Sequence, residues 1–502
     1  MSPTLLFTFV FGYFLLLLGV AWFTSRNSNN DTFFIGNRKS NWMLVAFGMI
    51  GTSLSGVTFV SVPGTVGTGG FGYFQVVIGY FLGYFVVAFV LLPLYYKMKL
   101  TSIYNYLLNR FGITAYKTGA LFFIISRTLG ATARLYLVIN VLQIFILDQM
   151  HIPFWLTAFI ILLMIILYTI EGGVKTIVFT DTLQTTFMLL GLLICVFYIM
   201  SQMHFSPIET LSALKKENYL RLLNTDYKSA GFFLKSIIGG AFITIAMTGL
   251  DQEMMQKNIS VHNLKDSQKN MLTLSFLQGV VVFIFLTLGG LLYLYATSKG
   301  GAFEQLLVDG KPKMQFLLDH KNIIGDDIFP KIVFNYLPPF IGIIFILGLI
   351  SALFPSADGA LTALTSSFCI DIIGLKRNEQ WDEKKKKNIR ITVHIIFSLI
   401  FFLCVMIFKW IDNRSIIDII LKLAGYTYGP LLGLFAFGIL TKRKLSESFL
   451  IPVICLVAPA ICYLLSDKSA VWFNGYQIGI ELLILNGLIT FLGLLVISKR
   501  SS

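Results

Sequence analysis

Apolar runs long enough to cross a lipid bilayer follow one another along almost the whole sequence. A transmembrane helix needs roughly 20 apolar residues, and about thirteen runs reach that length. Because the bilayer core offers no water to backbone polar groups, such runs fold as helices that satisfy their own hydrogen bonds. The sequence therefore predicts an all-α, polytopic membrane protein. The predicted helices cover 3–24, 41–62, 70–96, 117–147, 153–170, 176–202, 229–252, 270–298, 331–370, 389–410, 415–440, 447–466 and 477–498.

The composition excludes the main classes of soluble protein. Hydrophobic residues make up 56% of the chain and charged residues 13%, whereas a soluble domain carries about 25% charged residues. A soluble enzyme, a disordered chain and a nucleic-acid-binding protein are therefore excluded. An enzyme acting inside the membrane is also disfavoured, because the five histidines form no catalytic cluster. The five cysteines stand apart in apolar runs, which is typical of core residues rather than metal ligands.

The distribution of Lys and Arg predicts how the chain crosses the membrane. The net charge is +14, and most of the excess falls in segments that share one side if the N-terminus is outside. The positive-inside rule then places the C-terminus in the cytoplasm, with the chain in the plasma (inner) membrane. Lys257 is counted here as one of the cytoplasmic loop charges. The four lysines at 384–387 are interpreted as an anchor at the cytoplasmic surface, and a specific anionic-lipid site is the alternative.

A few ionisable residues lie inside the predicted spans. Such residues are costly to bury in a bilayer, so each is a candidate for function. We expect Lys235 to reach a membrane surface with its charged end. Asp418 and Lys422 are four positions apart, so we expect them to pair with each other. The set comprises Arg127, Arg134, Asp181, Lys235, Asp358, Asp418 and Lys422.

Two predicted spans contain sequences that disfavour a continuous helix. The second span reads GTSLSGVTFVSVPG over 51–64, and the seventh carries Gly239-Gly240 followed by Thr244, Thr248 and Gly249. Small and hydroxylic residues are weak helix formers and permit an unwound stretch with free carbonyl groups. Interrupted spans at matching positions of two halves indicate a transporter site between inverted repeats. Close packing of glycine-rich helices is the alternative.

Several motifs, in the same order along the chain, resemble the sodium/solute symporter family. The most specific is EGGVKTIVFTDTLQ at 171–184; the others are DTFFIGNR at 31–38, VPG at 62–64, Asp251-Gln252 with Gln256, and YGPLLG at 428–433. The resemblance implies a LeuT-type fold with a five-plus-five inverted repeat and broken helices. It divides the chain into a first helix and loop (1–40), two repeats (41–202 and 203–440) and two C-terminal helices (441–502). It also implies sodium-coupled symport by alternating access. We expect the chain to act as a monomer.

The resemblance further implies where sodium binds. Backbone carbonyls of Gly51, Leu54 and Ala352 and the hydroxyl of Ser356 fall on the family's ligand positions, and oxygen atoms at a helix break suit a hard cation. Many members carry two adjacent hydroxyl residues in the ninth span, whereas this chain has Pro355-Ser356. Because proline lacks an N–H group, the carbonyl four residues earlier loses its helical partner.

Two carboxylates, Asp181 and Asp358, are further candidates for cation binding. Asp181 matches an Asp that holds a second sodium ion in some members, although Ala352 and Pro355 do not match the accompanying serines. The alternative for Asp181 is a structural carboxylate, either hydrogen-bonded or paired with Lys175. Asp358 shares one helical face with Pro355 and could bind a cation, relay a proton or balance an arginine. A proton-coupled symporter of the same fold is therefore the alternative to sodium coupling.

The substrate is expected beside the break in the second span. An arginine inside the membrane can bind a carboxylate through two parallel hydrogen bonds, which favours an organic anion such as a carboxylate or sugar acid. Met247 and Thr248 stand where related sugar transporters carry aromatic residues, which disfavours a neutral sugar. A neutral sugar or an amino acid remains the alternative. The candidate substrate-binding residues are Ser53, Ser55, Thr58, Gln75, Arg127, Arg134 and Thr248.

Overall fold

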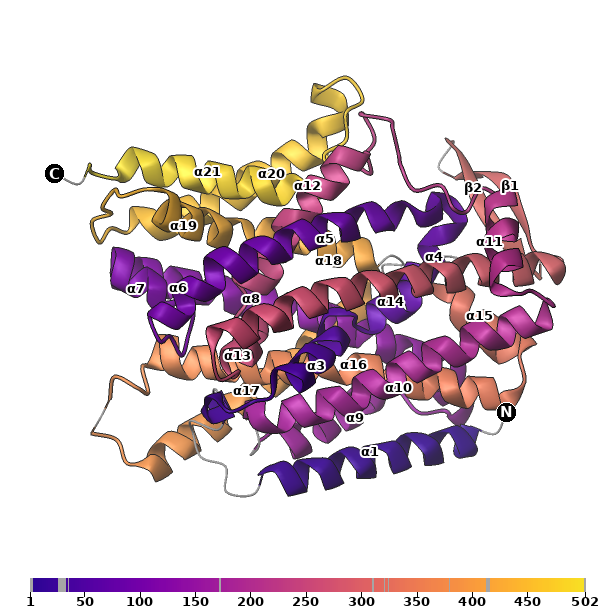
Figure 1. The fold of residues 1–502 in the computed structure, drawn as a ribbon, viewed down its shortest axis with the longest axis horizontal. Helices are drawn as coiled ribbons and strands as arrows, with labels where there is room; N and C mark the ends of the chain where they lie inside the picture. The colour runs from indigo at the N-terminus through magenta and orange to yellow at the C-terminus, as the bar shows by residue number, and fades with distance from the viewer. Residues whose placement is uncertain are drawn as a thin grey trace.

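Helices run roughly parallel to one another through the whole molecule (Figure 1). The computed structural model describes residues 3–25, 33–34, 36–170, 173–308, 311–319, 321–323, 325–378, 380–411 and 416–500. Parts of two sequence motifs lie outside these residues, namely Asp31, Thr32, Ile35, Glu171 and Gly172, and so does the side chain of Asp418. The expected pair between Asp418 and Lys422 therefore stays a prediction.

The elements are named in chain order, with α for α-helices and η for 3-10 or π-helical turns. The first half contains α1 (Pro3–Ser25), η1 (Gly36–Arg38), α3 (Trp42–Ser53), α4 (Gly56–Gly69), η2 (Gly70–Tyr73), α5 (Phe74–Val86), η3 (Val87–Leu91), α6 (Leu92–Lys97), α7 (Asn105–Phe111), α8 (Ile113–Leu142), η4 (Gln143–Leu147), η5 (Asp148–Met150), α9 (Phe154–Thr169), α10 (Gly173–Gln202) and α11 (Pro207–Lys216). The second half contains α12 (Phe233–Thr244), η6 (Ile245–Gly249), α13 (Gln252–Ile259), α14 (Leu264–Ser298), β1 (Ala302–Val308), β2 (Lys311–Leu318), β3 (Lys321–Ile323), η7 (Gly325–Asp327), α15 (Ile328–Tyr336), α16 (Pro339–Ser367), η8 (Phe368–Ile373), α17 (Glu383–Ile411), α18 (Ile416–Thr427), α19 (Gly429–Leu440), α20 (Leu450–Trp472) and α21 (Leu482–Ile497).

The described residues confirm a multi-spanning helical protein but leave the number of spans open. Eight helices within the described chain are long and apolar enough to cross a membrane, or up to ten if each of two bent pairs is one span. Three shorter apolar helices add to these: α3, α9 and α21. The figure of about thirteen spans therefore stays a prediction. The single run predicted over 331–370 is wrong, because α15 ends at Tyr336 and α16 begins at Pro339.

The second predicted span is broken where the sequence indicated. Helix α3 begins at an N-cap in which the Asn41 side chain accepts a hydrogen bond from Met43 N–H, and it ends at Ser53. Ser55 is extended, with φ −70° and ψ 176°, and α4 starts at Gly56. The seventh span is broken as well, since α12 with η6 meets α13 at an angle of 64°. Both breaks leave backbone groups without helical partners inside the bundle.

Close contacts between small residues hold the helices around these breaks. A Cβ added to Gly51 would lie 2.4 Å from Thr185 Oγ1 on α10, and one added to Gly48 would lie 2.9 Å from Asp181 Cβ. A Cβ on Gly64 would lie 2.0 Å from the carbonyl oxygen of Gly325. Helix α3 therefore packs directly against α10, and the end of α4 packs against η7.

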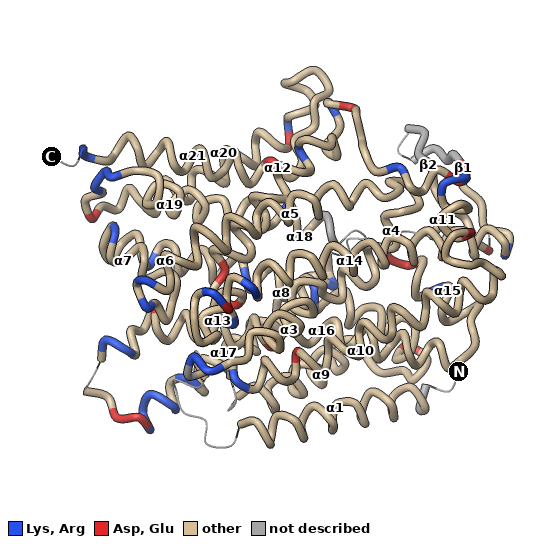
Figure 2. The backbone as a smooth tube through the Cα atoms, in the orientation of Figure 1, with Lys and Arg blue, Asp and Glu red and all other residues tan. Residues whose placement is uncertain are grey.

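One end of the bundle carries most of the Lys and Arg residues. Figure 2 shows them gathered where α19 and α21 end and α17 begins, at the end opposite the start of α1. We call this the basic end. It is the end that the sequence predicts to be cytoplasmic, and this orientation stays a prediction.

The opposite end carries a small antiparallel sheet that the sequence analysis did not foresee. Its strand order is β1-β2-β3. Phe303 and Phe316 of this sheet pack on Tyr293 of α14, with ring centroids 5.7 and 5.1 Å away. Helix α11 packs against α14 and begins with a capping box between Ser206 and Glu209. The Ser206 backbone N–H bonds the Glu209 carboxylate and lowers the pKa of that carboxyl group.

Candidate functional site

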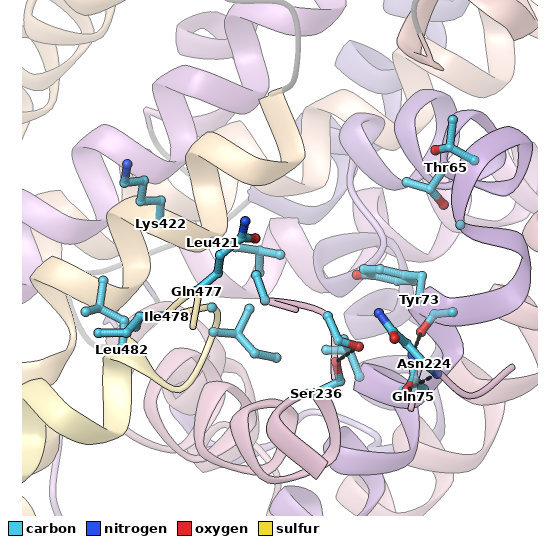
Figure 3. A pocket seen from close by; sticks show the side chains of 18 of the residues that line it. Thr65, Tyr73, Gln75, Asn224, Ser236, Leu421, Lys422, Gln477, Ile478 and Leu482 are labelled. Atoms are coloured by element: carbon cyan, nitrogen blue, oxygen red, sulfur yellow. Dashed lines mark hydrogen bonds between the residues drawn. The ribbon is translucent and has the colours of Figure 1, made fainter. Parts of the chain in front are cut away.

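A large vestibule enters the bundle from the end opposite the basic end. Its volume is about 890 Å³, and its walls come from the end of α4, η2, the segment before α12, α18 and the connection from α20 to α21. Gln75 lies here rather than in the inner cavity: its amide donates to the Gly72 carbonyl (2.8 Å) and accepts from Asn224 N–H (3.3 Å). Figure 3 shows Gln75 beside Asn224, with Tyr73 and Leu421 also on the vestibule wall.

A second, smaller cavity lies beside the break between α3 and α4. Its volume is about 100 Å³. Tyr73 and Leu421 border both this inner cavity and the vestibule, so the two adjoin. Six of the seven predicted substrate-binding residues line the inner cavity: Ser53, Ser55, Thr58, Arg127, Arg134 and Thr248. The structure brings these six together, and their role in binding stays a prediction.

Aromatic and amide groups that the sequence analysis missed complete the inner cavity. Tyr73, Tyr80, Tyr84 and Gln278 line it. The hydroxyls of Tyr73 and Tyr80 lie 3.4 Å apart, and Tyr84 donates to Gln278 at 2.7 Å. The recurrence of tyrosine in the third span was the available signal, because a Tyr hydroxyl buried in a membrane usually requires a polar partner.

The two arginines of α8 have different environments. Arg127 is buried and pairs with Glu253, and its second amino group lies 3.8 Å from Asp251. Arg134 is half-buried, and among the described residues its guanidinium has no hydrogen-bond or ion-pair partner. Arg127 therefore pairs with Glu253 of α13 and with Asp251 at the N-cap of that helix, and not with Asp181 or Asp358.

Lys257 corrects the interpretation of this region as a cytoplasmic loop. It lies on α13 with 3% of its side chain exposed, and its ammonium is 2.7 Å from Asp181 Oδ2. The same ammonium donates to Thr52 Oγ1 at 2.7 Å, and Thr52 in turn donates to Asp181 at 3.3 Å. Asp181 therefore pairs with Lys257, not with Lys175. The spacing of Glu253 and Lys257, one helical turn apart, was the signal for a folded helix here.

These ion pairs close the molecule between the inner cavity and the basic end. Arg127 of α8 and Tyr428 next to α19 both contact Asp251, the latter through a hydrogen bond of 2.6 Å. Lys257 connects α13 to α10 and α3. Four helices and Tyr428, at the N-cap of α19, are thus held together by buried polar contacts whose partners are 4% exposed or less.

Asp358 lies on α16 and is fully buried. Its Oδ2 accepts a hydrogen bond from the Tyr168 hydroxyl at 2.7 Å, and its Oδ1 accepts one from Gly359 N–H at 2.5 Å. Asp358 is thus hydrogen-bonded from α9 and forms no ion pair among the residues that the structure describes. The three roles considered for Asp358 stay predictions.

The predicted sodium-binding positions lie on two neighbouring helices. Pro355 Cγ of α16 lies 3.4 Å from the position that a Cβ of Gly51 would take, so the break after α3 faces α16. Ser356 donates its hydroxyl hydrogen to the Leu353 carbonyl at 2.9 Å, which leaves the oxygen lone pairs available to a cation. Leu54 and Ala352 are buried. Oxygen ligands without net charge suit Na⁺, and no group of three or more His, Cys, Asp or Glu residues in the described chain is placed to hold a metal ion.

Comparison with known proteins identifies the family. The profile described as "Sodium:solute symporter family" matches residues 33–452. The chain belongs to the sodium:solute symporter family. Two curated relatives are the sodium/sialic acid symporters NanT of Aliivibrio fischeri and SiaT of Proteus mirabilis. They are 22% and 24% identical, and the alignments cover 97% and 96% of this chain and 93% of each relative.

A solved structure confirms the LeuT-type fold of this symporter. The substrate-bound, outward-open structure of a Na⁺-coupled sialic acid symporter superposes with a TM-score of 0.81 at 20% identity, over 99% of both chains. Mhp1, a nucleobase-cation-symport-1 family transporter in a closed conformation, gives a TM-score of 0.54 at 11% identity, over 94% of this chain and 95% of its own. The symporter is therefore a multi-pass membrane transporter and not an enzyme, and it couples solute movement to Na⁺.

Proposed function

We propose that this symporter carries a small organic anion together with Na⁺, and that Arg134 binds the anionic group of the solute. One observation carries the proposal: Arg134 borders the inner cavity and has no partner among the described residues. A guanidinium inside a membrane protein requires a counter-charge, because burying an unpaired charge is unfavourable. A carboxylate matches the planar, two-pronged geometry of the guanidinium.

The neighbouring charges support this assignment. Arg127 is already paired with Glu253 and Asp251, so it offers less capacity for a solute. Arg134 lies two helical turns further along α8, toward the vestibule, where a solute arrives first. Ser55 and Thr58 supply hydroxyl groups to the same cavity. These groups suit a solute that combines a carboxylate with hydrogen-bonding substituents.

The size of the cavity limits how the solute lies. The inner cavity, at about 100 Å³, has room for a short carboxylate. A longer acid would place its carboxylate at Arg134 and extend past Tyr73 into the vestibule. The sialic acid symporters among the relatives support this second arrangement. A neutral sugar leaves Arg134 without a partner and is not favoured.

Alternating access requires the binding site to be open toward one end of the molecule and closed toward the other. In the present state the vestibule is open at one end, while the buried ion pairs of α13 close the basic end. If the basic end is cytoplasmic, this state faces outward. Both cavities and the closing contacts come from a single chain, so we expect the monomer to be sufficient. Proton coupling, the alternative to sodium coupling, is not favoured in a family defined by sodium symport.

A binding experiment with purified protein tests the substrate proposal. Carboxylates, sugars and amino acids are screened by thermal shift, each with and without Na⁺. We expect a carboxylate to raise the melting temperature only when Na⁺ is present, and its uncharged amide analogue to have no effect.

The matched variant is Arg134→Gln. It should abolish the carboxylate response, with a loss of affinity of about 100-fold from roughly two charge-assisted hydrogen bonds. It should retain the shift caused by Na⁺ alone. An unchanged carboxylate affinity in Arg134→Gln, or a sodium-dependent response to neutral sugars only, would contradict the proposal.

A further inference from the structure

The ammonium group of Lys257 lies in a position surrounded by oxygen atoms. Asp181 Oδ2 and Thr52 Oγ1 are each 2.7 Å from Nζ, and Glu253 Oε1 is 3.6 Å away. These atoms come from three elements, α10, α3 and α13 itself. A cluster of carboxylate and hydroxyl oxygens is also the environment that a hard metal cation such as Na⁺ prefers.

This position adjoins the predicted sodium-binding positions. Thr52 stands between Gly51 and Leu54, whose carbonyls are the expected ligands on α3. From the other side, α16 approaches so closely that a Cβ on Gly359 would lie 3.0 Å from Lys257 Nζ and 2.4 Å from Glu253 Oε1. Lys257 therefore occupies the space between α3, α10 and α16 next to the sodium site.

Around Lys257, buried carboxylates outnumber buried cations, and the ammonium neutralises part of this negative charge. Four buried carboxylates lie on α13, at its N-cap, or on α10 and α16, which pack against it: Asp181, Asp251, Glu253 and Asp358. The cations are Arg127, which pairs with Asp251 and Glu253, and Lys257, which pairs with Asp181 and Glu253. Without the ammonium, Asp181 would have only Thr52 as a hydrogen-bond partner, and its Oδ1 has none in the described chain.

We propose that Lys257 is a built-in cation that fills the position beside Asp181, so that this symporter binds one sodium ion and not two. A second Na⁺ beside Asp181 would have to displace the ammonium or accept its repulsion at contact distance. The charge supplied by Lys257 stays with the protein through the transport cycle. This inference rests on sodium coupling and is independent of the solute.

Direct measurement of bound sodium tests the inference without any knowledge of the solute. Binding of ²²Na⁺ to the purified full-length protein is titrated to saturation, and the number of ions per chain is determined. We expect one ion for the native protein. For Lys257→Met we expect two ions, because the carboxylates of Asp181 and Glu253 become available to a second Na⁺.

Two further variants show whether a second bound Na⁺ occupies the vacated position beside Asp181 or results from a general change in the protein. Lys257→Arg retains a cation beside Asp181 and should bind one ion. The double variant Asp181→Asn/Lys257→Met removes the carboxylate as well as the ammonium, and should return to one ion. It leaves no charge of this pair unbalanced.

The number of bound ions distinguishes a failure of the role proposed for Lys257 from a failure of sodium coupling itself. Two ions bound to the native protein, or one ion bound to folded Lys257→Met, would overturn the role of Lys257. If Lys257→Met does not fold, Asp181→Asn decides the question: it should still bind one ion, and loss of that ion would identify Asp181 as a sodium ligand. A native protein that binds no sodium would instead contradict the sodium coupling itself.

Discussion

Arg127 and Arg134 lie two turns apart on α8 and both border the inner cavity, yet only Arg127 has carboxylate partners. Removing one member of a buried ion pair leaves the other charge unsatisfied, which is strongly destabilising. Removing a buried charge that has no partner relieves an unfavourable burial, so it leaves the stability unchanged or raises it. The two positions should therefore differ in stability as well as in solute binding.

We expect Arg127→Gln to lower the free energy of unfolding by about 3–5 kcal/mol, because Glu253 loses its ion-pair partner and Asp251 loses a nearby cation. Arg134→Gln should leave the stability unchanged or slightly higher. Thermal or denaturant unfolding in detergent, with Na⁺ and no solute, measures both. Equal destabilisation by the two substitutions would show that Arg134 has a structural partner after all.

The last turn of α3, before the break, packs against both α10 and α16. Gly51 N–H donates to Thr185 Oγ1 at 3.2 Å, so α10 supports the last turn of α3. Pro355 of α16 lies against the same glycine. Sodium binding should therefore respond to small changes in this packing, even where no ligand is altered.

Gly51→Ala tests how closely α3 must approach α10. The added Cβ would lie 2.4 Å from Thr185 Oγ1, so one of the two helices must shift. We expect the sodium concentration for half-maximal transport to rise at least about tenfold, which corresponds to roughly 1.4 kcal/mol. Adding Thr185→Ala should restore part of the loss, because it removes the clashing oxygen.

The matched control for that experiment is Gly130→Ala. Gly130 is also in a helix, α8, but nothing lies within 4 Å of its added Cβ. Transport should remain as in the native protein. A comparable loss in this control would show that helix propensity or expression, rather than packing at the break, explains the effect.

Pro355→Ser tests the departure from the family pattern. The serine would place a second hydroxyl next to Ser356 and would allow an N–H to bond the carbonyl four residues earlier. One additional oxygen ligand should strengthen sodium binding by roughly 1 kcal/mol, or about fivefold. Sodium titration of thermal stability measures the change. Weaker binding would indicate that the free carbonyl created by Pro355 is itself a ligand.

The whole molecule presents two unlike ends, one open through the vestibule and one closed and basic. Gln477 is exposed on the vestibule wall, and Asn388 is exposed on α17 near the basic end. The native cysteines are buried, apart from the half-buried Cys404. Introduced cysteines can therefore report which end faces the outside.

A membrane-impermeant maleimide applied to intact cells should label Gln477→Cys and should not label Asn388→Cys. After permeabilisation both should react. A reagent that cannot cross the membrane reaches only the exterior, so the reverse pattern would show that the N-terminus is cytoplasmic. Adding Na⁺ should not reduce labelling of Gln477→Cys if sodium stabilises the open vestibule.

The sequence predicted much of the fold because its main signals are local. Hydropathy identified the helical bundle, and weak helix formers located the break between α3 and α4. The motifs predicted the family, the LeuT-type fold and sodium coupling, all of which the comparisons confirmed. Six of the seven predicted substrate-binding residues line one cavity, because the breaks that define the site are visible in the sequence.

Only the tertiary structure decided the partners of the charges. Lys257 follows a polar stretch that is typical of a loop, yet it is buried against Asp181, 76 positions away in the sequence. Likewise, nothing local separates Arg127 from Arg134. Hydropathy describes how each segment prefers water or lipid, whereas an ion pair depends on which distant segments meet. The sequence by itself therefore determined the apolar helices and the break beside which the candidate site lies, and the packing of α13 against α3, α8 and α10 determined which buried charges are paired.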